Sequence, residues 1–533
     1  MSRAYQQTFV DEMLPNEWKK GHTSVLLALP VGGGKTRCAR LVVSKLAKVG
    51  GWDCWILDHR KELTEQFSEE FREMAPAVYW AGKPSPKPHW LRIAGRDTLI
   101  RRDWQPTPST TKCLVITDEA HHAAERNTYG KLYEQFRSQY KTVYMLGLTA
   151  TPYRLDGKPL DRIFTSLIEP VTPGELIDSG ILMEPRVIGA DAPNLADLHI
   201  QGGDFAASEL EMRSRKLVGN VVEEWKRWSD GYPGVLRAVS IAHSKELCER
   251  LRAAGFRAEH MDGATPAHER NALFARLAIG GQRGAGAGID ILCQVDVASE
   301  GWNPPSDYER VLKMPELWPS ADRPPPYVPL CVLSDCRPTL SRSGYRQFEG
   351  RGSRPMGDKI STSLGPLGAL PKPWFRLISH SKNYERFGFL RDHHTFDLNT
   401  GSVGGESRQP RQKDGLLSCR YCPVCLSVWP TSQKDCPPPC GSALSTPPPP
   451  VEETTEKLAP LGATVDATPK QRVGYLTSLW ISHRRKNEQR AAQGKPPISE
   501  NQIRAIFHSY SGRWPTKADM DEAKRASDEK IKK

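Results

Sequence analysis

Long apolar runs are absent from the 533-residue sequence. A helix that crosses a lipid bilayer needs about 20 consecutive apolar residues, and no stretch of this chain approaches that length. The segment 1–11 is polar and lacks the apolar centre of a signal peptide. These two absences exclude an integral membrane class and lead us to expect a cytosolic protein.

Acidic residues are in the minority among the charged ones. The chain has 74 Lys and Arg against 62 Asp and Glu, which gives a formal net charge of +12. This balance favours a polyanionic partner such as nucleic acid. At about 150 residues per domain, the length predicts three to four domains with sizeable cores.

Strand-like and helix-like stretches alternate from residue 1 to about residue 189. This alternation predicts an α/β domain in which a parallel sheet is covered by helices on both faces. The expected strands are 25–29, 54–57, 113–117 and 142–146, and the expected helices are 37–48 and 62–74.

A second α/β domain is expected over 233–394, after a linker (190–232) that carries a helix at 208–228. Its predicted strands include 238–242 and 289–293, and a proline-rich segment, 314–329, predicts a surface loop. The rest of the chain is expected to form a loop (395–417), a cysteine-rich ribbon (418–442), a Pro-rich linker (443–469) and a basic helical segment (470–533).

A glycine-rich segment, L-P-V-G-G-G-K-T at 29–36, joins the first predicted strand to the first predicted helix. The backbone N–H groups of such a loop and the helix N-terminus attract phosphate. Gly32, Gly33 and Gly34 would cradle the phosphates, Lys35 would reach the β- and γ-phosphates, and Thr36 would ligate Mg²⁺. Leu29 stands where the strict pattern has its first glycine, and an ordinary glycine turn is the alternative.

Two adjacent carboxylates, Asp118 and Glu119, follow the predicted strand 113–117. Nucleotide hydrolysis needs one carboxylate to hold Mg²⁺ and another group to orient or activate water. Open parallel sheets bind ligands at the carboxyl ends of their strands. Asp118 and Glu119 could therefore supply both groups, with a solvated turn as the alternative.

Five of the 12 cysteines lie between residues 419 and 440. In a reducing compartment such clustering indicates metal ligation rather than disulfides. The spacing of two close pairs predicts a structural Cys₄ zinc ribbon formed by Cys422, Cys425, Cys436 and Cys440. Cys419 lies three residues before the first pair and is left as a competing ligand.

The motifs and their order resemble superfamily 2 helicases of the DEAD/DEAH-like type. The chain is similar in particular to the RadD-like and phage-encoded type III restriction helicase-subunit group, over about residues 3–357. The resemblance implies two tandem RecA-like domains that bind ATP and Mg²⁺ in the cleft between them. It implies a location in the cytosol of a bacterium or a phage-infected host, with DNA as the partner.

The resemblance also assigns roles in the first domain, where Asp118 would hold the metal and Glu119 would act on the water. Gln6, in R-A-Y-Q (3–6), would contact adenine. Arg60, in H-R-K-E-L (59–63), would grip the phosphates of one strand. Thr149 and Thr151, in G-L-T-A-T-P (147–152), would couple hydrolysis to movement along the nucleic acid.

In the second domain, Ser299 and Gly301, in S-E-G-W-N-P (299–304), would contact nucleic acid and nucleotide respectively. Gln347, Arg351 and Arg354, in Q-F-E-G-R-G-S-R (347–354), match the arginine-finger motif. Arginines of this kind stabilise charge on the transferred phosphoryl group.

The resulting hypothesis is an ATP-dependent DNA helicase or translocase. An RNA helicase is the first alternative, because these motifs do not separate the two sugars. The second is a nucleic-acid-binding adaptor with a degenerate motor, acting through the zinc ribbon, which could also bind a protein partner, and through the tail. Aromatic residues among the basic ones of that tail either stack on bases or form a small core: Trp480, Tyr510 and Trp514. We recognise no nuclease constellation.

Overall fold

The structure is a computed structural model whose contacts divide the chain into two units, Met1–Pro449 and Pro450–Lys533. It describes residues 2–125, 127–152, 158–190, 192–195, 198–284, 286–297, 302, 304, 308–320, 323–355, 372–399, 403–404, 417–422, 424–425, 427–437, 440–445 and 517–531. In the second unit the described element is helix α18 (Lys517–Ile531), which lies in the segment predicted to be basic and helical. The predicted linker and the three tail aromatics lie mostly or wholly outside the described residues. Among the described helices, none combines the length and apolar composition that spanning a bilayer requires.

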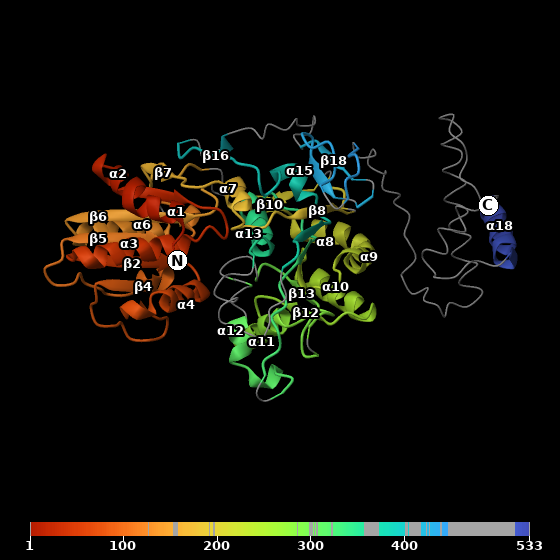
Figure 1. The fold of residues 1–533 in the computed structure, drawn as a ribbon, viewed down its shortest axis with the longest axis horizontal. Coiled ribbons are helices and arrows are strands. Elements are labelled where there is room, and N and C mark those ends of the chain that lie inside the picture. The colour runs from red at the N-terminus through yellow and green to blue at the C-terminus, as the bar shows by residue number, and fades with distance from the viewer. Residues whose placement is uncertain are drawn as a thin grey trace. The chain divides into compact units, whose positions relative to one another are not determined.

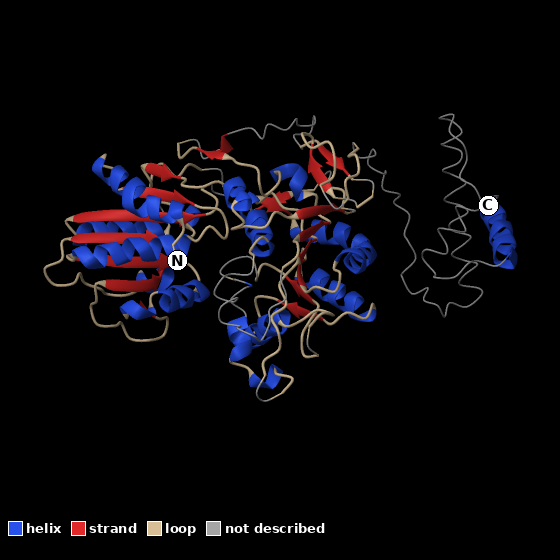
Figure 2. Cartoon of the chain, in the orientation of Figure 1, coloured by secondary structure: helices blue, strands red, loops and turns tan. Residues whose placement is uncertain are grey.

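The first half of the larger unit is built on a seven-stranded parallel sheet, which Figures 1 and 2 show with its helices. Its strands are β1 (Ser24–Ala28), β2 (Trp52–Asp58), β3 (Ala77–Tyr79), β4 (Leu91–Gly95), β5 (Lys112–Thr117), β6 (Thr142–Thr149) and β7 (Ser166–Ile168). They lie in the order β3-β4-β2-β5-β6-β1-β7. The α-helices are α1 (Ala4–Thr8), α2 (Leu14–Lys19), α3 (Lys35–Val49), α4 (Lys61–Glu70), α5 (Arg96–Leu99), α6 (Thr128–Gln139) and α7 (Pro173–Asp178).

Both faces of this sheet are covered because its central strands are predominantly apolar, with buried residues in succession along each strand. Successive strand residues point to opposite faces, so Val25 lies in a core with Val42 of α3. Leu26 lies in a separate core with Phe136 of α6. The strands predicted at 25–29, 54–57, 113–117 and 142–146 are confirmed as β1, β2, β5 and β6.

A second parallel sheet has six strands. They are β8 (Arg186–Gly189), β11 (Gly234–Arg237), β12 (Ala258–Met261), β13 (Ile291–Gln294), β14 (Val332–Asp335) and β15 (Arg376–Ser379), in the order β12-β13-β11-β14-β15-β8. The α-helices of this half are α8 (Ala207–Ser214), α9 (Val218–Trp228), α10 (Ile241–Ala253), α11 (Ala267–Ala278), α12 (Tyr308–Leu312), α13 (Arg342–Gly352) and α15 (Asn383–Phe387). Leu333 shares a core with Phe348 of α13, and Val332 shares one with Trp225 of α9 on the opposite face. The predicted fold class, two tandem parallel-sheet α/β domains, is confirmed.

The strand predicted at 238–242 is wrong. β11 ends at Arg237, and α10 begins at Ile241 after Ser240, whose hydroxyl accepts the N–H of His243. A serine that caps in this way ends the extended chain and starts a helix. The predicted strand 289–293 is found two residues later, as β13.

The division of the chain also differs from the sequence-based one. β8 pairs with β15 and completes the second sheet, although the predicted boundary places residues 186–189 in the first domain. α9 was expected within a linker, yet Val221 and Trp225 are buried against the second sheet. The apolar side of α9 therefore makes it a part of the second domain.

Two predicted loops contain ordered structure. The proline-rich segment ends with Tyr327 and Val328, which are 3% and 1% exposed, and the Val328 N–H donates to the Ala278 carbonyl. Burial of these two apolar side chains beside α11 makes this part of the segment a core element. The loop predicted at 395–417 contains an antiparallel pair, β16 (Thr395–Phe396) and β17 (Val403–Gly404). A similar short pair, β9 (Ile200–Gln201) and β10 (Asp204–Phe205), precedes α8.

Candidate nucleotide site and cysteine cluster

Four of the predicted motifs follow four adjacent strands of the first sheet. β2, β5, β6 and β1 are neighbours and run parallel. Segments 59–63, 118–121, 149–152 and 29–36 therefore leave the sheet at the same edge. This edge, at the carboxyl ends of the strands, is where open parallel sheets bind ligands.

The segment 29–36, which is predicted to hold phosphate and is therefore called the phosphate loop, turns tightly between β1 and α3. The Gly33 N–H donates to the Pro30 carbonyl over 2.8 Å, and Gly32 and Gly34 have φ values of 85° and 87°. These left-handed conformations favour glycine, which has no Cβ to clash. Gly34 is the N-cap residue of α3, so Lys35 and Thr36 occupy the first helical turn, two residues before the predicted start of the helix at 37.

The N-terminal motif R-A-Y-Q contacts the backbone carbonyls of this loop. The Tyr5 hydroxyl and the Gln6 amide both donate to the Gly33 carbonyl, over 2.6 and 3.2 Å. Arg3 donates to the Gly32 carbonyl over 3.4 Å, and its N–H donates to the Gln6 side-chain oxygen. Gln6 is 2% exposed. The motif thus supports the phosphate loop directly, a role of Arg3 and Tyr5 that the sequence analysis did not assign.

The acidic motif lies opposite Lys35. Asp118 is 6% exposed, and its N–H donates to the Leu57 carbonyl of β2. Glu119 has a φ of 44°, a left-handed conformation that costs a non-glycine residue about 1–3 kcal/mol and is concentrated at functional sites. Glu119 Oε1 lies 3.4 Å from Lys35 Nζ. The two residues predicted to act on phosphate and on water are therefore in contact.

A series of polar contacts leads from Glu119 to the second domain. His121 Nδ1 lies 3.5 Å from Glu119 Oε2 and 3.0 Å from Thr149 Oγ1. The Thr149 hydroxyl accepts the N–H of Thr151, and the Thr151 hydroxyl shares a 2.9 Å hydrogen bond with Ser343 of α13. The carboxylate motif is thus connected through β6 to α13, the helix that carries Arg351.

Helix α13 lies against the phosphate loop. A Cβ built on Gly350 would be 2.5 Å from Cβ of Val31, and one built on Gly32 would be 3.7 Å from Cγ of Arg354. These close approaches bring the arginine motif beside the loop that the sequence predicts to hold phosphate. Gln347, in the same motif, is 3% exposed.

Arg351 and Arg354 converge on one acceptor, the Trp302 carbonyl. Trp302 is 5% exposed and its ring stacks on Phe274. Ser299 and Gly301, the predicted contacts of the same motif, lie outside the described residues. The position of Trp302 still places that motif next to the arginines.

A lysine missed by the sequence analysis holds the end of α13. Burial lowers the pKa of Lys372 to about 8, and its ammonium group donates to the carbonyls of Gly352 and Arg354. These carbonyls come at the end of a helix, where partners for C=O groups are lacking. Lys372 thereby holds the backbone at Arg354 in place.

Comparison with known proteins agrees with this arrangement. Residues 1–154 match the family described as "Type III restriction enzyme, res subunit". A "51.5 kDa protein" of a Lactococcus phage (isolate 7-9) is 27% identical over 453 residues, 84% of this chain and 83% of that protein. These matches support a superfamily 2 helicase of the type III restriction-like group. A further relative is a Saccharomyces cerevisiae protein with the provisional name ATP-dependent helicase IRC3. It is 24% identical over 371 residues, which are 66% of this chain but only 49% of the yeast protein.

Among solved structures, the chain is similar to a fragment from Vibrio vulnificus YJ016. That fragment is described provisionally as an HsdR subunit of a type I restriction enzyme. The TM-score is 0.51 at 18% identity, and the match covers 72% of this chain and 65% of the fragment. At this identity the likeness concerns the fold.

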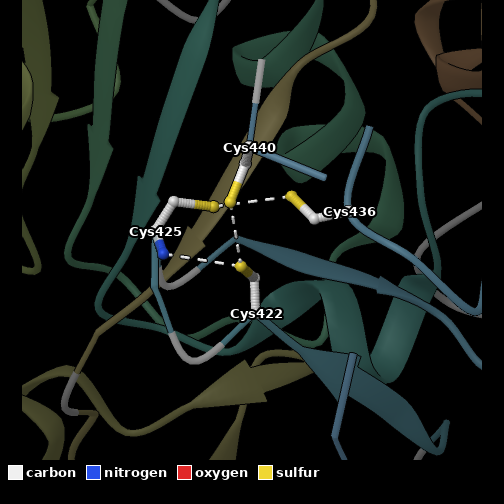
Figure 3. A group of neighbouring side chains, drawn as sticks. All are labelled: Cys422, Cys425, Cys436 and Cys440. Atoms are coloured by element: carbon white, nitrogen blue, oxygen red, sulfur yellow. Dashed lines mark hydrogen bonds between the residues drawn. The ribbon is translucent and has the colours of Figure 1, made fainter. Parts of the chain in front are cut away.

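The four predicted zinc ligands come together in the structure. The Sγ atoms of Cys422, Cys425, Cys436 and Cys440 all lie within 4.8 Å of one another, and Figure 3 shows them pointing toward a common centre. Four sulfurs at such separations match the donor set of a tetrahedral zinc site. Cys419 is buried, and its sulfur approaches the Leu417 carbonyl. It does not belong to the cluster.

The cluster is built on a two-stranded ribbon, β18 (Cys419–Tyr421) and β19 (Val428–Pro430). The Ser427 hydroxyl lies 3.0 Å from Cys425 Sγ and 3.3 Å from Cys436 Sγ, and the Ser442 hydroxyl lies 3.3 Å from Cys440 Sγ. Hydroxyls in these positions can donate to thiolate sulfur, which supports negative charge on the cysteines.

Proposed function

We propose that the chain is an ATP-dependent motor that moves along DNA or separates its strands, using ATP bound between its two parallel-sheet domains. The observation that carries the proposal is the contact of three groups at one sheet edge. These are the phosphate loop, the Lys35–Glu119 pair at 3.4 Å, and α13, which approaches Val31 at Gly350.

The donor set fits a magnesium nucleotide. Thr36 and Asp118 offer the oxygen ligands that Mg²⁺ prefers, and Lys35 with the loop N–H groups would hold the phosphates. Bound Mg²⁺ would neutralise charge that develops on the phosphates. Glu119 would accept a proton from the attacking water, and Gln347 would help to position that water.

Arg351 and Arg354 would stabilise the phosphoryl group from the second domain. In related nucleotidases such arginines contribute about 10³–10⁵-fold in rate. Closure of the domains would complete the site, and product release would open it. The hydrogen bond between Thr151 and Ser343 gives this cycle a direct mechanical link from the carboxylate motif to α13.

Arg60 supports the nucleic-acid part of the proposal. It is the N-cap residue of α4, at the same sheet edge as the nucleotide site, where its side chain could reach backbone phosphate. Thr149 and Thr151 lie at the end of a neighbouring strand, and Ser299 would add a contact from the second domain. Contacts of this kind are mainly electrostatic and weakly sequence-specific. The restriction-like relatives favour DNA over RNA.

We also propose that the cysteine cluster binds one structural Zn²⁺ through Cys422, Cys425, Cys436 and Cys440. Four thiolates leave no ligand position for water, so a catalytic role is excluded for such a centre. The ribbon's Val428 lies in the core of the second domain, which favours a structural role over a mobile nucleic-acid-binding module.

The choice of nucleic acid is tested by measuring ATP hydrolysis alone and with single-stranded DNA, duplex DNA or single-stranded RNA, each at two salt concentrations. The proposal predicts strong stimulation by DNA that weakens at the higher salt concentration. Stimulation by RNA alone would make the chain an RNA motor instead. No hydrolysis under any condition would favour the adaptor alternative.

A further inference from the structure

Arg186, the first residue of β8, contacts the cysteine cluster from outside the ribbon. Its guanidinium donates to Cys425 Sγ over 2.6 Å and lies 3.8 Å from Cys436 Sγ. The two sulfurs are themselves 3.5 Å apart. One cation of the second sheet thus faces two of the four proposed zinc ligands.

The positive charge of Arg186 is complementary to the negative charge of a zinc-loaded cluster of four thiolates. Four thiolates around Zn²⁺ carry a net charge of −2, and an arginine side chain stays protonated at any physiological pH. Arg186 would therefore offset half of the excess negative charge. Groups that hydrogen-bond to metal ligands fix their orientation, and their loss typically costs 10–100-fold in metal affinity.

The ribbon covers the free edge of the second sheet. β8 is the last strand of that sheet, and Ile188 forms an antiparallel bridge with Ser427 of the ribbon. A Cβ built on Gly189 would lie 2.7 Å from the Tyr421 ring and 2.9 Å from Val428, so the two backbones approach closely. Covering an edge strand protects it from unwanted pairing and makes the position of β8 depend on the ribbon.

The four residues that precede Arg186, 182–185, connect β8 to the proposed nucleotide site. A Cβ built on Gly32 of the phosphate loop would lie 2.7 Å from the Leu182 side chain. The Met183 N–H donates to the Ser353 carbonyl over 2.6 Å, between Arg351 and Arg354. Pro185 precedes Arg186 and restricts both its own backbone and that of Glu184, so the connection is short and stiff.

We propose that Arg186 is a positioning residue that couples metal binding in the ribbon to the nucleotide site. The metal-loaded ribbon fixes β8 through Arg186 and Ser427, and β8 in turn holds Leu182 and Met183 between the phosphate loop and the end of α13. This inference rests on the proposed zinc centre and the proposed nucleotide site, and adds a link between them.

The first test measures zinc retention in the full chain. Wild type, Arg186→Gln and Arg186→Lys are titrated with the chromogenic chelator 4-(2-pyridylazo)resorcinol. Arg420→Gln serves as the control, because Arg420 lies in β18 of the same ribbon and its substitution removes the same charge. We expect zinc affinity to fall about 10- to 100-fold in Arg186→Gln, to fall less in Arg186→Lys, and to stay at the wild-type value in Arg420→Gln. Equal affinity in wild type and Arg186→Gln, or an equal loss in Arg420→Gln, would overturn the role of Arg186.

The second test measures amide hydrogen exchange in zinc-loaded and zinc-stripped wild type. We expect faster exchange after stripping in 182–189 and in 29–36, with β6 unchanged. Unchanged exchange in 182–189, or an increase that includes β6 and so reports loss of the fold, would overturn the coupling. Neither test uses ATP hydrolysis, so an inactive wild type would refute the proposed function without deciding this one.

Discussion

Replacement of Gly350 by alanine tests whether α13 really lies against the phosphate loop. The new Cβ would stand 2.5 Å from both Cβ and Cγ1 of Val31, whereas carbon atoms prefer about 3.5–4.0 Å. The helix and the loop would have to separate by roughly 1 Å to reach that range. The substitution acts on the contact between the two domains and leaves every predicted catalytic side chain in place.

Two opposing terms set the size of the effect. Alanine is better than glycine within a helix by about 0.8–1.0 kcal/mol, while overpacking costs about 1–3 kcal/mol. The stability of the chain should therefore change little. If the overpacking cost falls on the closed, hydrolysing arrangement, kcat/KM for ATP should drop about 5- to 150-fold, since 1.36 kcal/mol corresponds to a factor of ten.

The assay is steady-state ATP hydrolysis in the presence of DNA, with thermal unfolding measured in parallel. Gly344→Ala is the matched control, because its Cβ would meet only Ser341 at the start of the same helix, at 3.2 Å or more. Val31→Gly in the Gly350→Ala background removes all the Val31 side-chain atoms that clash and should restore part of the lost activity. Wild-type kcat/KM in Gly350→Ala, or no rescue by Val31→Gly, would refute the contact between α13 and the loop.

Three further predictions concern other parts of the chain. Glu119→Gln should bind ATP as wild type does but hydrolyse it at least about 100-fold more slowly, because it cannot accept a proton; normal turnover would remove Glu119 from that role. Elemental analysis should find one zinc per chain, which is lost when Cys422 and Cys425 are both changed to Ser; a folded wild type without metal would end the zinc proposal. Burial lowers the pKa of His243 to about 4, and its Nδ1 accepts the Val239 N–H. The unfolded state therefore binds more protons than the folded state between pH 6.5 and 4. As the pH decreases through that range, the free energy of unfolding should fall by about 1.4 kcal/mol per pH unit. The free energy of unfolding, measured with denaturant at pH 7 and pH 5, should differ less in His243→Gln than in wild type. An equal difference in the two proteins would contradict the lowered pKa of His243.

The parts of the site that follow from local sequence were predicted well. The buried strand, the glycine loop and the helix after it all depend on neighbours in the chain, although α3 begins two residues before the predicted start at 37. The same holds for Asp118 and Glu119, which end an apolar strand. Local patterns of this kind determine backbone conformation through burial and the freedom of glycine.

The parts that the sequence could not give depend on contacts between distant segments. Nothing around residue 186 shows that β8 crosses into the second sheet, because its pairing partner β15 is about 190 residues away. The convergence of Arg351 and Arg354 on the Trp302 carbonyl likewise has no local signal. The prediction of a strand at 238–242 was wrong for another reason. The apolar residues around Ser240 resemble a strand, but the Ser240 hydroxyl caps the N-terminus of α10.

The central claim, that this chain hydrolyses ATP at the loop that ends in Lys35, is tested most directly by comparing ATP hydrolysis of wild type, Lys35→Ala and Lys45→Ala in the presence of DNA. Lys45 lies on the same helix and pairs with Asp11 at the surface, so its loss removes an equal charge away from the loop. We predict DNA-stimulated hydrolysis in wild type and Lys45→Ala and none in Lys35→Ala. Hydrolysis at the wild-type rate in Lys35→Ala would contradict the account.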